Sequence, residues 1–167
     1  MAKHTYFLGM FALVSIIAVE VALGFSRGDV TLACNTMHPG HLGFGGQSSR
    51  APFGIYVTPD DDGTYVVTVY GARNGKFKGF MLQARDPTND RRVGSFVSVQ
   101  NSGRIIDCSY AGGAVQHNDS QDKTQVSARW DPGQYKGGKV RFRATVVQSY
   151  FTYWTGIIQE YDLQSKD

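Results

Sequence analysis

Hydrophobic and polar residues alternate along several short stretches of this chain, most clearly over residues 79–85. In an extended conformation, one side of this segment carries Phe80, Leu82 and Ala84. The other side carries Met81, Gln83 and Arg85. This period of two is typical of a half-buried β-strand. The turn-forming residues 86–90 follow, with Pro87 disfavouring helix before it, and a second apolar run starts at Val93. The region therefore predicts a strand, a turn and another strand.

The same alternation recurs along the rest of the chain. Further strands are expected over residues 52–57, 65–70, 103–109, 123–130, 139–148 and 153–158. Turn formers separate them, and residues 133–139 are interpreted as a hairpin loop. Seven or more short strands without an amphipathic helix predict an all-β protein, an antiparallel β-sandwich. Trp130 and Trp154 are expected in its core.

The first 24 residues have the composition of an export signal. Lys3 and His4 precede an apolar run, and small residues at positions 22–24 suit a signal peptidase. We therefore expect a signal peptide over residues 1–24 and a single domain over residues 25–167. A membrane anchor is the alternative, but Glu20 interrupts the run before the roughly 20 residues that a bilayer requires. No stable membrane span is expected.

Charge and cysteine content narrow the function classes further. The formal net charge of +3 among 167 residues is too small to indicate nucleic acid as a partner. An isolated pair of cysteines in an exported protein is most economically interpreted as one disulfide, between Cys34 and Cys108. Two buried free thiols are the alternative. The spacing does not fit zinc, whose ligands usually come in close pairs.

Several segments resemble the reeler (reelin-type) domain, above all that of small secreted arthropod defence proteins. The matching segments are residues 34–41, 79–85, 93–96, 114–117 and 140–147, together with Trp130 and the pair Tyr153 and Trp154. The resemblance runs from about Cys34 to about Gln159. It implies an immunoglobulin-like β-sandwich and a secreted protein of innate immunity.

Four basic residues are the candidate ligand-binding set. They alternate with apolar residues on the last long strands, so they should point outward: Arg129, Lys139, Arg141 and Arg143. If the strand ending at Trp130 pairs with the strand starting at Lys139, all four share one exposed face. Such a face suits phosphate or carboxylate groups of a microbial polymer. A solvated strand face that discourages edge pairing is the alternative.

Other candidate sites carry weaker signals. His41 and His117 are candidate metal ligands, with His38 and Asp119 near them in sequence; hydrogen bonding to loop backbone is the alternative. Asn118 begins a glycosylation sequon. Three adjacent aspartates at 60–62 are interpreted as a turn rather than a calcium loop. No cofactor is expected.

Three functions are compatible with these observations. The first is a defence protein that binds microbial surface polysaccharide, lipopolysaccharide, teichoic acid or glucan, as the resemblance implies. The second is an extracellular matrix or adhesion module that binds glycosaminoglycan or protein. The third is an enzyme, which is disfavoured because no nucleophile with a base and no convincing metal set is identifiable. The sequence does not indicate an oligomeric state.

Overall fold

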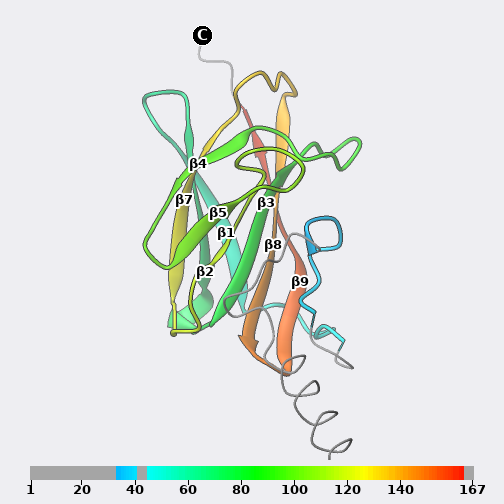
Figure 1. The fold of residues 1–167 in the computed structure, drawn as a ribbon, viewed down its shortest axis with the longest axis vertical. Helices are drawn as coiled ribbons and strands as arrows, with labels where there is room; N and C mark the ends of the chain where they lie inside the picture. The colour runs from blue at the N-terminus through cyan, green and yellow to red at the C-terminus, as the bar shows by residue number, and fades with distance from the viewer. Residues whose placement is uncertain (1–32, 41–44, 164–167) are drawn as a thin grey trace, which may run out of the picture.

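The chain folds into two antiparallel β-sheets packed face to face (Figure 1). The computed structural model describes residues 33–40 and 45–163. The predicted signal peptide and His41 lie outside the described residues. The strands are β1 (Phe53–Pro59), β2 (Tyr65–Gly71), β3 (Gly79–Arg85), β4 (Ser95–Val99), β5 (Gly103–Ile106), β6 (Ala114–His117), β7 (Gln125–Asp131), β8 (Lys139–Ser149) and β9 (Thr152–Asp162). One short 3-10 helix, η2 (Ala72–Asn74), connects β2 to the segment before β3.

The strand order is β1-β2-β7-β4 in the four-stranded sheet and β5-β6-β3-β8-β9 in the five-stranded sheet. The predicted antiparallel β-sandwich is therefore confirmed. The interpretation of residues 133–139 as a hairpin loop was wrong, since they carry the chain from β7 in one sheet to β8 in the other. Strand β6, of four residues, was not predicted.

The core lies between the two sheets, where the alternating apolar residues face one another. Trp130 on β7 and Phe142 on β8 are fully buried, and their rings meet edge to face at 5.3 Å. This geometry suits the positive edge and negative face of aromatic rings. Trp154 is also buried, as the sequence predicted, and its indole nitrogen donates to the Ser49 hydroxyl.

The five-stranded sheet has a second covering layer on its outer face. The N-terminal arm, residues 33–40, lies against this face (blue in Figure 1). Met37 of the arm is 1% exposed and its carbonyl accepts a hydrogen bond from Thr145 of β8. A small cluster of buried residues forms beneath the arm: Cys34, Met37, Met81, Cys108 and Ala114.

This layer corrects the prediction for β3. The strand was expected to be half-buried, yet all seven of its residues are buried. The core covers its apolar side, and the arm and flanking loops cover the other side, so Gln83 and Arg85 are removed from solvent. The predicted disulfide between Cys34 and Cys108 is present and ties the arm to the loop after β5.

No helix among the described residues has the length and apolar character needed to cross a membrane.

Replacing both Cys34 and Cys108 by serine should lower the free energy of unfolding by about 4 kcal/mol, because the bridge closes a long loop in the unfolded chain. The two cysteines are separated by 74 positions. Urea unfolding of the two proteins under identical conditions measures the difference. Cys34→Ser alone is the control and should cost as much as the double change. A loss below about 1 kcal/mol would contradict this account.

Candidate functional site

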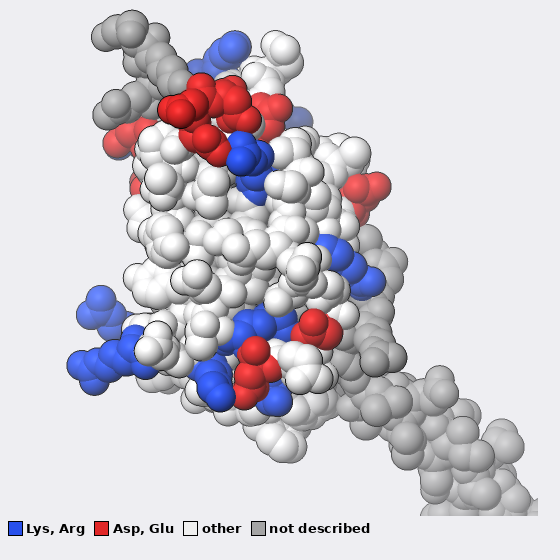
Figure 2. Space-filling model, turned by 90° about the vertical axis from the view of Figure 1, so that its left-hand side faces the viewer, with Lys and Arg blue, Asp and Glu red and all other residues white. Residues whose placement is uncertain are grey.

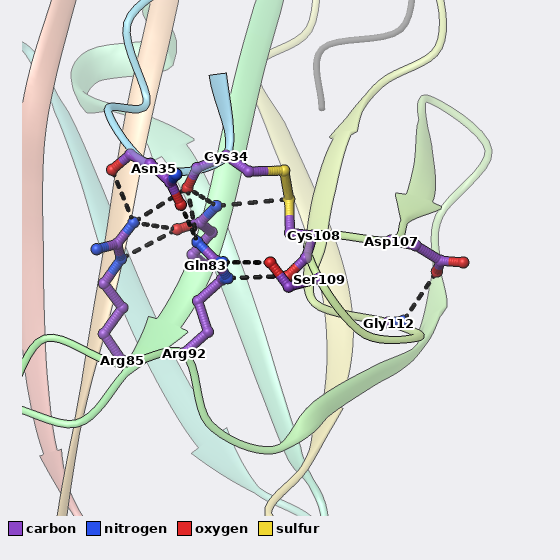
Figure 3. Close-up of a disulfide and its surroundings, with 9 residues drawn as sticks. All are labelled: Cys34, Asn35, Gln83, Arg85, Arg92, Asp107, Cys108, Ser109 and Gly112. Carbon is purple, nitrogen blue, oxygen red and sulfur yellow. Dashed lines mark hydrogen bonds between the residues drawn. A yellow bond between two sulfur atoms is a disulfide. The ribbon is translucent and has the colours of Figure 1, made fainter. Parts of the chain in front are cut away.

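Arg85, the last residue of β3, is buried beneath the arm and satisfied by several acceptors (Figure 3). Its Nε and Nη2 donate to Gln83 Oε1 at 3.0 and 2.6 Å. Its Nη2 also donates to the carbonyl oxygens of Cys34 and Asn35, at 3.1 and 3.2 Å. Its Nη1 donates to the Asp90 carboxylate at 2.6 Å. This strand residue is therefore bonded to the arm and to the turn that follows β3.

A second guanidinium, that of Arg92, converges on the same place (Figure 3). Its Nη1 donates to the Cys34 carbonyl at 3.0 Å, and its Nε donates to the Cys108 carbonyl at 3.0 Å. Its Nη2 donates to the Ser109 hydroxyl at 2.8 Å. Both residues of the disulfide thus offer their carbonyl oxygens to Arg92.

A recess of about 350 Å³ lies beside these two arginines. It is lined by Asn35, Arg85, Asp90, Arg91, Arg92, Ser109 and Tyr110. Three guanidinium groups and one carboxylate give this lining a net charge of +2. The acceptors of Arg92 are carbonyl, amide and hydroxyl oxygens, which satisfy its hydrogen bonds without cancelling its charge. Arg91 is exposed, and its side chain has no partner among the described residues. We call this the arginine recess.

Three residues of the lining have unusual conformations or environments. Asp90 and Ser109 both adopt left-handed backbone, with φ of 57° and 77°. That conformation costs a residue with a Cβ roughly 1–2 kcal/mol. Burial raises the pKa of the Tyr110 phenol, whereas the positive charges of Arg92 and Arg85 act in the opposite direction. The field of the two arginines therefore reaches the tyrosine at the edge of the recess.

The predicted basic face does not form as a single surface. Arg129 lies on β7 in the four-stranded sheet, whereas the other three predicted residues lie on β8 in the five-stranded sheet. The expected pairing of those two strands was wrong. On the side of the molecule drawn in Figure 2, charged side chains fall into separate groups of mixed sign, with a broad uncharged band between them.

Acidic side chains face each of the four predicted basic residues. Arg129 Nη1 lies 2.7 Å from Asp60 and 3.0 Å from Asp62, in the turn between β1 and β2. On β8 the pairs are Lys139 with Asp162 at 3.4 Å, Arg141 with Glu160 at 2.7 Å and Arg143 with Asp90 at 3.9 Å. Carboxylates thus offset most of the charge of this set. Arg143 is close to the arginine recess because it shares Asp90 with Arg85.

The other predicted site residues lie apart from the recess. His117, at the end of β6, is half-buried, with Nδ1 3.2 Å from both the amide nitrogen and the carbonyl oxygen of Phe80. The role of His117 and His41 as metal ligands stays a prediction, since His41 lies outside the described residues. Among the residues that the structure describes, no group of three or more His, Cys, Asp or Glu could hold a metal. Asn118 is exposed, and its side-chain amide donates to the Asn101 carbonyl at 2.6 Å.

Sequence reasoning missed the recess because its arginines come from a strand and from the turn after it. Arg85 alternates like an outward strand residue, and Arg91 and Arg92 follow a run of turn formers. The one available signal was the pair of adjacent arginines immediately after that turn.

The fold and the recess define a disulfide-bonded antiparallel β-sandwich domain with a cationic recess among its loops. The family model described as the reeler domain matches residues 32–166, and the chain belongs to that family. The resemblance noted from the sequence segments is thereby confirmed.

Three similar proteins place this chain among known ones. It is 34% identical over 155 residues to "Defense protein l(2)34Fc" of Drosophila melanogaster, covering 88% of this chain and 92% of that protein. It is 33% identical over 155 residues to "Ferric-chelate reductase 1" of Bos taurus, covering 87% of this chain but only 25% of that longer protein. Its fold resembles the human F-spondin reeler domain, with a TM-score of 0.56 and 19% identity, covering 72% of this chain and 95% of that domain.

The His117 environment predicts a loss of stability in mild acid. Burial lowers the pKa of His117 below its ordinary value of 6.5, and the charges of Lys123 and Arg104 add to this effect. The unfolded chain therefore takes up a proton first as the pH falls. The contribution of His117 to stability is fully present above the pKa that this histidine has in the unfolded chain. It declines as the pH falls from there toward the pKa of His117 in the folded protein.

Urea unfolding at pH values between about 7.5 and 5.5 measures this dependence. His117→Gln should show a flatter stability profile over the same range than the parent protein. An identical slope in the two proteins would assign the pH dependence to other groups.

Proposed function

We propose that this reeler-domain protein is exported and acts in defence by binding anionic groups on microbial surface polymers such as lipopolysaccharide or teichoic acid. The observation that carries the proposal is the arginine recess, whose lining has a net positive charge. Phosphate and carboxylate groups form charge-assisted hydrogen bonds with guanidinium donors, and these are roughly twice as strong as bonds between neutral groups.

The free guanidinium of Arg91 is the first contact in this proposal. Arg85 uses its donors within the protein, so it supplies field more than hydrogen bonds to a ligand. Arg91 is exposed at the same recess, and its fork can hold two oxygens of a phosphate or carboxylate. In this proposal an anionic polymer contacts Arg91 first, and the positive charges of the arginines behind it attract the polymer further.

Two further observations are compatible with a role in defence. The Drosophila protein named for defence is matched over nearly its whole length, whereas the bovine reductase is matched over a quarter of its length. The disulfide between Cys34 and Cys108 is compatible with export, because such bonds persist in oxidising compartments. Reductase chemistry is therefore not proposed for this chain.

Arg91→Gln should weaken retention on lipopolysaccharide and on teichoic acid about tenfold, since one charge-assisted fork is lost. Retention of the purified protein on immobilised polymer and on whole bacteria measures the effect. Arg141→Gln is the matched control, because Arg141 is paired with Glu160 and does not line the recess. It should change retention less than about twofold.

The same retention experiment is repeated at raised salt concentration and on heparin. Raising the salt from about 0.1 to 1 M shortens the screening length from about 10 to 3 Å, so retention should fall steeply. Retention that resists both salt and Arg91→Gln would overturn the proposal. Preference for heparin over both microbial polymers would favour the matrix-module function instead. A larger loss in Arg141→Gln than in Arg91→Gln would return the binding role to the predicted strand residues.

A further inference from the structure

A second recess, of about 270 Å³, adjoins the arginine recess. The two share Arg92 and Tyr110 as lining residues, so these side chains stand between them. The second recess is completed by residues at the start of β4 and in the loop before it, and by residues at the end of β7 and in the loop after it: Val93, Gly94, Ser95, Asp131, Pro132, Gly133, Gln134 and Tyr135. We call it the tyrosine recess.

The two recesses differ in charge. The tyrosine recess has one guanidinium, from Arg92, and one carboxylate, from Asp131, so its lining is neutral. Its other functional groups are the phenol hydroxyls, the Ser95 hydroxyl and the amide of Gln134, which both donate and accept hydrogen bonds. Rings that combine an apolar body with a polar tip suit a ligand with the same mixed character, such as a sugar.

Contacts within the protein hold the walls of the tyrosine recess in place. The Tyr135 hydroxyl donates to the Lys139 carbonyl at 2.7 Å, and Asp131 Oδ1 accepts from the Gly133 amide at 2.8 Å. Gly94 has a φ of +60°, and a Cβ at this position would lie 2.4 Å from the Trp130 ring. The loop before β4 therefore packs directly on a core tryptophan, and a fixed wall of this kind reduces the ordering cost of binding.

We propose that the two recesses form one site for a phosphorylated sugar. The phosphate lies in the arginine recess, against Arg91 and the Ser109 side of Arg92, and the sugar ring lies in the tyrosine recess, against Tyr110 and Tyr135. The inference rests on the proposed function and names the chemical unit of the polymer that this site takes. A phosphate monoester carries up to two negative charges at neutral pH, which matches the net charge of +2 on the arginine recess.

Left-handed backbone occurs within this site as well as elsewhere. Of the five non-glycine residues with positive φ among those described, Asp90 and Ser109 line the arginine recess, and Met37, Arg73 and Asn74 do not. Strain of this kind concentrates where a ligand is held, because the surrounding structure must be fixed to maintain it. Here the disulfide beside Ser109 and the ion pair between Asp90 and Arg85 maintain it.

Titration of the purified protein with glucose 1-phosphate, inorganic phosphate, glucose and glucuronate tests the site. Calorimetry gives the affinities, and amide chemical shifts give the location. Glucose 1-phosphate should bind about tenfold more tightly than inorganic phosphate, because only it fills both recesses. Glucose alone should bind too weakly to detect, and glucuronate, with one charge, should bind more weakly than glucose 1-phosphate. Shift changes should include Ser109, Tyr110 and Gln134.

Two variants separate the halves of the site. Arg91→Gln should weaken glucose 1-phosphate and inorganic phosphate alike, by about tenfold. Gln134→Ala should weaken glucose 1-phosphate about fivefold while leaving inorganic phosphate within about twofold, because Gln134 lines only the tyrosine recess. Gln134 is exposed, so folding should survive its loss, and Gln125→Ala, also exposed and outside both recesses, is the matched control.

The outcomes distinguish this inference from the proposed function. Equal affinity for glucose 1-phosphate and inorganic phosphate would overturn the two-recess site, and Arg91-dependent retention on bacteria would still support the proposed function. Preference for glucose 1-phosphate that Gln134→Ala removes would support the site, even where retention on bacteria proves independent of Arg91. Tighter binding of glucuronate than of glucose 1-phosphate would assign the site to acidic sugars without phosphate and overturn the inference.

Discussion

The carbonyl oxygen of Cys34 is the acceptor on which the outer layer of this domain depends. It accepts hydrogen bonds from the Gln83 amide and from the guanidinium groups of Arg85 and Arg92. A buried guanidinium needs acceptors for its hydrogen bonds, and the arm supplies two of those that Arg85 uses, the carbonyl oxygens of Cys34 and Asn35. The disulfide with Cys108 holds that carbonyl where the donors need it. The disulfide and the buried guanidinium of Arg85 thus both hold the N-terminal arm in place.

The same arrangement couples the fold to the recess. Asn35 and Ser109 each follow a disulfide cysteine in sequence, and both line the arginine recess. The disulfide is the covalent link between these two walls of the recess, and hydrogen bonds from Arg85 and Arg92 to the arm add to it. The residues that stabilise the outer layer therefore also line the arginine recess.

Alternation predicted every strand except β6, but it did not predict which strands pair. It placed Trp130 inward correctly, since only a side that faces a core is continuously apolar. It says nothing about which strands are neighbours, and so the pairing expected for Arg129 and Lys139 was wrong. Burial of Arg85 was equally beyond the pattern, because the arm that covers it, with two of its acceptors, lies about 50 positions earlier in the sequence. The arginine recess depends on such contacts between residues that are far apart in the sequence.

A comparison of Arg141 with Arg92 explains why basic residues alone do not locate positive charge that is left uncancelled. Both guanidinium groups make short hydrogen bonds, but Arg141 bonds to the Glu160 carboxylate and Arg92 bonds to carbonyl, amide and hydroxyl oxygens. A carboxylate cancels the charge, whereas a neutral oxygen satisfies the donor and leaves the charge. Positive potential therefore persists where arginines are used to hold backbone rather than to pair with acids. In this domain that condition is met around Arg92, where the arm meets the loops after β3 and β5.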